Sequence, residues 1–206
     1  FPDSRVVYVS SGNVYRFASV EGKGATETDP LDPVGEYAQS RLAGERLVEY
    51  FSVENETPVA IIRLFYATEL RYGIILDIAQ RVWREEPIDL SMGYVNQIWQ
   101  GDANSFLAQS FPLCSSPARI LNLTGSDVLS VRTLASELGK VMEKEPLFEG
   151  EEQSTALLGD ASEIFKKLGV PKIEPEQMVS WVAQWVMKDE KTHGKPTKYD
   201  SRTGTF

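Results

Sequence analysis

The sequence has few of the residues that build disulfides, metal sites or nucleic-acid surfaces. One of its 206 residues is a cysteine, Cys114, and one is a histidine, His193. A single cysteine excludes an internal disulfide and is typical of a reducing compartment. Together with one histidine it provides no conventional zinc site. The net charge of −9 argues against a partner with a phosphate backbone. We therefore expect no metal and no nucleic acid.

The sequence also lacks long hydrophobic runs and a glycine-rich phosphate loop. No apolar run approaches the length of a membrane span, and no secretory signal is visible, so we expect a cytoplasmic protein without membrane contact. Dinucleotide-binding folds hold a pyrophosphate with a Gly-x-Gly-x-x-Gly turn between the first strand and the first helix. The nearest match, Gly-Lys-Gly-Ala-Thr-Glu at residues 22–27, follows no strand and lacks the third glycine. We interpret it as a loop.

What is present is an α/β pattern of ordinary globular composition, with 42% hydrophobic and 25% charged residues. Two β-branched runs, residues 5–11 and 58–66, predict buried strands. Residues 16–33 read as a loop, and a helical pattern runs from residue 34 to about residue 54. Glu45, Arg46 and Glu49 are predicted to lie on the solvated face of this helix. A strand, a helix and a second strand in this order indicate a right-handed crossover in a parallel sheet.

Further elements are expected in the C-terminal part of the chain. Asp102 suits the N-cap of a helix over residues 102–110, and Ser130 suits the N-cap of another. Trp181 and Trp185 lie on one stripe of the last predicted helix, which we interpret as core or interface. Residues 188–206 are polar and predict a solvated tail or an arm that packs on a neighbouring chain. The other predicted elements are strands at residues 87–91, 119–125 and 146–149, and helices at residues 74–85, 160–168 and from residue 175.

Tyr37 and Arg41 are four residues apart, so they share one face of the predicted helix. The pair alone also fits an ordinary surface position. A cation beside a phenol favours the phenolate, which would allow Tyr37 to act as a general acid or base. Ligands of parallel sheets bind at the carboxyl ends of the strands, where Ser11 and Tyr66 fall. The sequence therefore predicts a site that contains Ser11, Tyr37 and Arg41.

Three linked segments carry a family resemblance. The strand end reads Ser-Ser-Gly-Asn-Val-Tyr at residues 10–15, the loop reads Glu-Thr-Asp-Pro at residues 27–30, and the helix reads Pro-x-x-x-Tyr-x-x-Ser-Arg-x-x-x-Glu at residues 33–45. In this order and spacing they resemble the extended short-chain dehydrogenase/reductase family, the NAD(P)-dependent sugar epimerases and dehydratases. The resemblance implies an α/β fold with a doubly wound, Rossmann-like parallel sheet and a small α/β substrate-binding lobe. We expect the chain to be the C-terminal portion of such a protein, without the glycine-rich first βα units.

The resemblance also implies roles for individual residues. Ser11 resembles the family's catalytic serine or threonine, Tyr37 its catalytic acid/base, and Arg41 stands where the family has lysine. It implies NAD or NADP as cofactor, in contact with Ser10, Tyr37, Arg41 and Tyr66. Because the arginine fork is longer than the lysine ammonium, its charge can be kept while the contact with the nicotinamide ribose changes.

The expected substrate is a small polar molecule, a sugar or a sugar derivative, bound by Asn13, Asn96, Gln97 and Trp99. The amide-rich run at residues 96–100 can line a pocket for a neutral ligand, or it can form a strand edge bonded to its backbone neighbours.

Several positions depart from the family pattern. Tyr66 stands where the family has asparagine, and Gly12 and Asn13 replace the Asp-Glu pair of the dehydratases, so a dehydratase mechanism is not expected. Val95 stands at the place of an arginine that binds the substrate diphosphate, which argues against a standard nucleotide-sugar substrate.

Three functional hypotheses follow. The first is an epimerase/dehydratase-like oxidoreductase, with the activity in the full-length parent and this chain inactive alone. The second is a catalytically impaired family member that acts as a binding or regulatory protein. The third is a structural part of an oligomer that associates through the Trp181 and Trp185 stripe; by resemblance, a homodimer through the Tyr37 helix is also expected. We expect residues 1–67 to belong to the dinucleotide-binding domain, residues 68–187 to the substrate lobe with returning sheet elements, and residues 188–206 to the tail.

Overall fold

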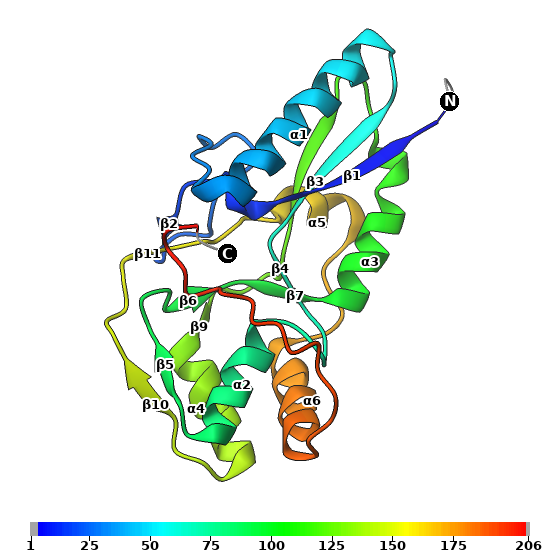
Figure 1. Cartoon of the computed structure of the whole chain (residues 1–206). Coiled ribbons are helices and arrows are strands. Elements are labelled where there is room, and N and C mark those ends of the chain that lie inside the picture. The colour runs from blue at the N-terminus through cyan, green and yellow to red at the C-terminus, as the bar shows by residue number, and fades with distance from the viewer. Residues whose placement is uncertain (1–3, 205–206) are drawn as a thin grey trace.

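The computed structural model describes residues 4–204, and three parallel strands form its central sheet (Figure 1). The strand order is β1 (Val6–Ser11), β3 (Val59–Leu64) and β8 (Arg119–Leu123). The single strand predicted over residues 58–66 is divided into β3 and a separate strand, β4 (Tyr66–Thr68), which pairs with β7 (Gln97–Trp99). The chain therefore leaves the sheet directly after β3.

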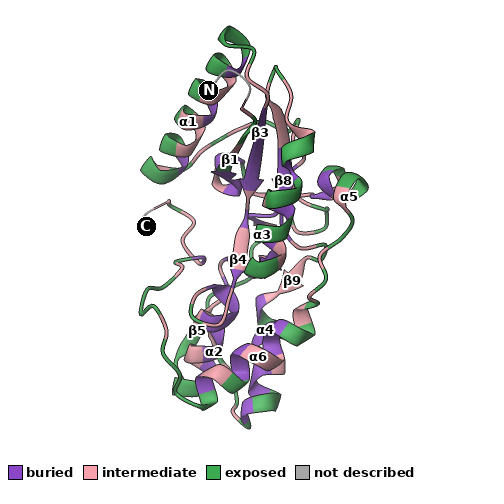
Figure 2. Cartoon of the chain, turned by 90° about the vertical axis from the view of Figure 1, so that its right-hand side faces the viewer, coloured by how far each residue is buried: buried purple, intermediate pink, exposed green. Residues whose placement is uncertain are grey.

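Helices cover both faces of this sheet, as Figure 2 shows. α1 (Gly35–Glu54) lies on one face, and α3 (Gln100–Gln109) and α5 (Ser162–Leu168) lie on the other. On the second face, the buried side chains of β3 and β8 pack against Phe106 of α3 and Ile164 of α5. The expected α/β fold with a doubly wound, Rossmann-like sheet is confirmed.

A second hydrophobic core lies below the sheet in Figure 1 and is built mainly by three helices. They are α2 (Ile74–Arg84), α4 (Val131–Met142) and α6 (Pro175–Met187). Ser130 caps α4 as predicted, because its hydroxyl accepts a hydrogen bond from the backbone amide of Thr133 at 3.2 Å. The short elements are β2 (Ala18–Ser19), β5 (Pro87–Asp89), β6 (Tyr94–Val95), β9 (Leu129–Ser130), β10 (Leu147–Glu149), β11 (Thr155–Ala156) and the 3-10 helices η1 (Gly12–Val14) and η2 (Phe111–Leu113).

Glu45 does not lie on the solvated face of α1, and that prediction is wrong. Its side chain is fully buried and forms an ion pair with Arg63 of β3, with Nη2 2.7 Å from Oε2. The Nη1 group of Arg63 donates to the Tyr15 hydroxyl at 2.6 Å, and that hydroxyl donates to Asn122 of β8 at 2.8 Å. Because buried charges need partners, this network ties α1 to two strands and to Tyr15, the residue that follows η1.

Asp102 is not the N-cap of α3, which begins two residues earlier. Its carboxylate instead accepts the backbone amides of Lys172 and Ile173, both at 2.9 Å. Asp102 therefore links α3 to the segment before α6. No helix among residues 4–204 is long and apolar enough to cross a membrane.

The chain after α6 packs on its own molecule, whereas the sequence predicts a solvated tail or an arm on a neighbour. We call residues 191–204 the C-terminal strap. It runs along α2, where Tyr199 is buried, and returns to the start of α1 (Figure 1). Arg202 donates to the Thr155 carbonyl at 2.8 Å and lies over the Phe17 ring at 4.4 Å. The aromatic and guanidinium groups of this polar segment thus fix it to the rest of the chain.

Candidate functional site

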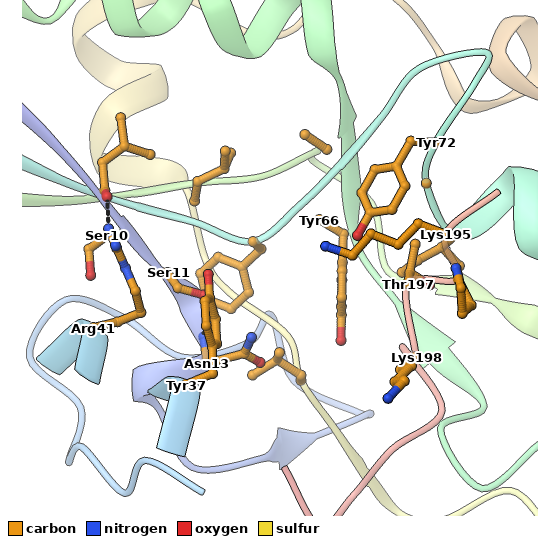
Figure 3. A pocket seen from close by; sticks show the side chains of 18 residues that line it. Ser10, Ser11, Asn13, Tyr37, Arg41, Tyr66, Tyr72, Lys195, Thr197 and Lys198 are labelled. Carbon is orange, nitrogen blue, oxygen red and sulfur yellow. Dashed lines mark hydrogen bonds between the residues drawn. The ribbon is translucent and has the colours of Figure 1, made fainter. Parts of the chain in front are cut away.

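A cavity of about 790 Å³ lies at the carboxyl ends of β1 and β3 (Figure 3). This is the edge at which open α/β sheets bind ligands. Its walls come from β1 and η1, from the start of α1, from the chain after β3, from the start of α2, and from the C-terminal strap. The polar side chains among its lining residues are those of Ser10, Ser11, Asn13, Tyr37, Arg41, Tyr66, Tyr72, Lys195, Thr197 and Lys198.

Two serines end β1 at this cavity. Ser11 is the N-cap of η1, and its hydroxyl oxygen accepts the backbone amide of Asn13 at 3.2 Å, which leaves the hydroxyl proton to donate. Ser10 is 95% buried, since 5% of its surface is exposed. Within residues 4–204 its hydroxyl has no hydrogen-bond partner. A buried hydroxyl without a partner is costly, so a ligand in the cavity would supply the missing bond.

Tyr37 and Arg41 both line the cavity, from the first two turns of α1. The Tyr37 side chain is 46% exposed. The guanidinium of Arg41 donates to the Val9 carbonyl, shown as a dashed line in Figure 3, and lies 5.3 Å from the centre of the Tyr8 ring. The structure therefore brings the predicted pair into one cavity and gives the Arg41 charge two further partners on β1.

Tyr66 and Tyr72 lie between the serine wall and the strap in Figure 3. Burial raises the pKa of the Tyr66 hydroxyl well above its ordinary range. Burial also raises the pKa of Tyr72, and the nearby Asp77 and Tyr37 add to that increase. Both phenols are therefore neutral near pH 7 and can donate hydrogen bonds to a ligand.

Sequence reasoning missed the C-terminal strap as a wall of the cavity. Thr197 is held by Asp77 of α2, whose carboxylate accepts the Thr197 backbone amide at 2.7 Å and also its hydroxyl. Lys195 and Lys198 flank this anchor and line the cavity. The spacing Lys-Pro-Thr-Lys was visible at residues 195–198, but no local pattern relates it to residues 150 positions earlier in the chain.

Three predicted substrate residues lie outside the cavity. Asn96 is buried and donates to the Gly159 carbonyl at 2.6 Å, which fits the alternative in which this run bonds to neighbouring backbone. Gln97 is buried and accepts the Thr68 hydroxyl. Trp99 packs edge-on against Trp181, with ring centres 5.2 Å apart. Of the predicted substrate residues, only Asn13 lines the cavity, whereas Gln97 and Trp99 belong to β7, which pairs with β4.

Comparison with known families supports the resemblance found in the sequence. Residues 2–68 match the model of the NAD dependent epimerase/dehydratase family. These residues include β1, α1 and β3, and thus Ser11, Tyr37 and Arg41. The match supports the resemblance to this family over residues 2–68, which the sequence alone had indicated. No curated protein matches the chain.

Solved structures extend the likeness to most of the chain. MoeE5 in complex with UDP-glucose and NAD has a TM-score of 0.74 at 19% identity, over 90% of this chain and 65% of that one. UDP-glucuronic acid 4-epimerase from Bacillus cereus, in complex with NAD, has a TM-score of 0.78 at 16% identity, over 91% and 63%. RMD from Pseudomonas aeruginosa, complexed with NADPH, has a TM-score of 0.74 at 16% identity, over 90% and 68%. At these identities the likeness establishes the fold, and the chain spans about two thirds of the length of each of these proteins.

The residues at the end of β1 fit one end of a dinucleotide cofactor. The hydroxyl of Ser10 and the buried Nε group of Arg41, which have no hydrogen-bond partner among the described residues, are donors at the wall formed by β1 and α1. They suit the hydroxyl and amide oxygens of a nicotinamide riboside. Among the described residues that line the cavity, Arg41, Lys195 and Lys198 carry positive charge and none carries a carboxylate. The cavity is therefore cationic in a chain whose net charge is −9.

Proposed function

We propose that this chain contributes the catalytic wall and the substrate lobe of an NAD(P)-dependent epimerase-like oxidoreductase that acts on a sugar or a sugar-derived substrate. One observation carries the proposal: Ser11, Tyr37 and Arg41 line a single cavity at the carboxyl edge of a Rossmann-like sheet. The segment that contains all three matches the epimerase/dehydratase family.

In this proposal the protein's own groups hold the substrate and move its proton. A nicotinamide held at this wall would supply hydride chemistry, since it can take the hydrogen of a carbinol C–H bond together with its electron pair. In its phenolate form the Tyr37 oxygen accepts the proton of the same carbinol and becomes a phenol, and the Ser11 hydroxyl donates a hydrogen bond to the carbinol oxygen. Ser10, Arg41 and Tyr66 contact the cofactor, and Asn13 contacts the substrate.

The chain is divided by role in this proposal. Residues 1–67 belong with the dinucleotide-binding domain, residues 68–187 form the substrate lobe interleaved with the returning strand β8, and residues 188–206 include the strap. We keep two further expectations as proposals: a cytoplasmic location, based on the single cysteine, and a homodimer through α1, based on its exposed Leu47 and Phe51.

The experiment measures reduced nicotinamide and epimerised sugar formed by the whole protein with NAD⁺ or NADP⁺ and a panel of sugars and UDP-sugars, because an epimerase returns the hydride to its substrate. Tyr37→Phe removes the hydroxyl and is expected to abolish turnover. Tyr50→Phe is the matched control, because Tyr50 is an exposed tyrosine on the same helix and does not line the cavity. Turnover retained in Tyr37→Phe would refute the role of Tyr37.

A second candidate is a family member that binds a ligand without catalysis. It is favoured by the contacts of the Arg41 guanidinium with the Val9 carbonyl and the Tyr8 ring, where the family has a compact ammonium. Arg41→Lys separates the two candidates, since restoring lysine raises turnover only in a working enzyme. Ligand binding with no turnover in either form would support the binding protein.

A further inference from the structure

The strap faces the cavity with two lysines on a fixed stretch of backbone. Thr197 lies between them and is anchored by two hydrogen bonds to Asp77, and Tyr199 is buried immediately beyond. Fixing the backbone on both sides of Lys198 limits where the two ammonium groups can reach. Both lysines line the cavity, and in Figure 3 the side chain of Lys195 extends from the strap toward Tyr66.

These lysines lie opposite the wall that suits the cofactor. Figure 3 places Ser10 and Arg41 on one side, the strap on the other, and Tyr66 and Tyr72 between them. A ligand atom beside the strap therefore belongs to the part of a bound molecule that is distant from Ser10. On the proposed function this part is the substrate.

Three acidic groups near the strap are engaged by other residues, and Lys198 also lines a second hollow with Glu86 and Asp200. Asp77 accepts Thr197, Asp200 lies 3.5 Å from Arg81, and Glu69 pairs with Arg71 at 3.1 Å and with His193 at 3.3 Å. Within residues 4–204 no carboxylate lines the cavity itself. Two ammonium groups that face a cavity without a carboxylate attract an anion.

We propose that Lys195 and Lys198 form an anion subsite that selects a substrate with a phosphate or carboxylate group. This inference rests on the proposed function for the position of the substrate. It replaces the expectation of a neutral ligand, which was based on an amide-rich run that the structure places elsewhere. Val95, which stands where the family has an arginine, is buried in the hydrophobic core of α2, α4 and α6. In this proposal the strap supplies the positive charge instead.

The test compares Lys195→Gln/Lys198→Gln with Lys188→Gln/Lys191→Gln in the whole protein. The control removes the same charge from the same end of the chain, at lysines that do not line the cavity. Isothermal titration calorimetry measures the binding of UDP-glucose, glucuronate, glucose and NAD⁺. We expect the first double variant to weaken UDP-glucose and glucuronate about tenfold, which corresponds to about 1.4 kcal/mol, and to leave glucose and NAD⁺ unchanged.

Each result has a defined meaning. Equal affinities in the two double variants would overturn the anion subsite, and so would a loss confined to NAD⁺, because the lysines would then hold the cofactor. The proposed function fails separately: if UDP-glucose binds through the lysines while the wild-type protein binds no NAD⁺ or NADP⁺, the subsite stands and the oxidoreductase does not.

Discussion

The buried ion pair between Glu45 and Arg63 provides a test of how the sheet and α1 are held together. Arg63 Nε lies 3.0 and 3.2 Å from the two Glu45 carboxylate oxygens, and Nη2 lies 2.7 Å from one of them. The side chains are 2% and 0% exposed. Glu45→Gln keeps the shape of the side chain and one acceptor oxygen but leaves the Arg63 charge buried without a counter-charge.

Removing one partner of a buried ion pair costs about 3–5 kcal/mol, and we expect about 3 kcal/mol because the amide oxygen remains. Most single domains have an unfolding free energy of about 5–15 kcal/mol, so this loss is a large part of the total stability. The double variant Glu45→Leu/Arg63→Met removes both charges. We expect it to be more stable than Glu45→Gln, since apolar residues of similar volume often replace buried pairs at little cost.

Urea unfolding, followed by tryptophan fluorescence and far-ultraviolet circular dichroism, measures these changes. Glu49→Gln is the control, because Glu49 lies on the same helix in an exposed ion pair with Arg46, where a loss below about 1 kcal/mol is expected. Equal losses in Glu45→Gln and Glu49→Gln would refute the reasoning, because Glu45 would then behave as a solvated residue.

Two further predictions concern the walls of the cavity. Burial raises the pKa of Asp77 in the folded protein. The unfolding free energy of the wild type relative to Asp77→Asn is therefore greatest at acid pH and falls as the pH rises through that pKa. Urea unfolding of both proteins at several pH values measures this difference in unfolding free energy, and a difference that rises with pH would contradict the prediction. Gly12→Ala places a Cβ atom 2.4 Å from the Phe65 ring and should cost about 1–3 kcal/mol in unfolding free energy, whereas Gly22→Ala, whose nearest neighbour is 3.5 Å away, should change it little.

Sequence patterns predicted most helices and strands of this fold, because these elements depend on residues that are close together in the chain. The β-branched run of β1, the helical period of α1 and the Ser130 cap all depend on residues close in sequence. The same reasoning placed Ser11 and Tyr37 near one another, since both strand ends and helix starts meet at one edge of a parallel sheet.

Properties that depend on distant residues were not predictable in this way. Glu45 looks like a surface residue until Arg63 is folded against it, and Asp102 looks like a helix cap until the amide of Lys172 reaches it. The lysines of the strap had no visible partner in the sequence, because most of the cavity they face is formed by residues more than a hundred positions away. The errors at Glu45 and Asp102 came from charged side chains whose tertiary contacts decided their roles.

The central claim is that Tyr37 moves a substrate proton in a nicotinamide-dependent reaction. A single-turnover experiment tests it most directly, in which the whole protein is mixed with NAD⁺ or NADP⁺ and a sugar substrate while the absorbance of reduced nicotinamide is recorded. We expect a signal in the wild type and in Tyr50→Phe, and none in Tyr37→Phe. An unchanged signal in Tyr37→Phe, or no dinucleotide binding by the whole wild-type protein, would contradict it.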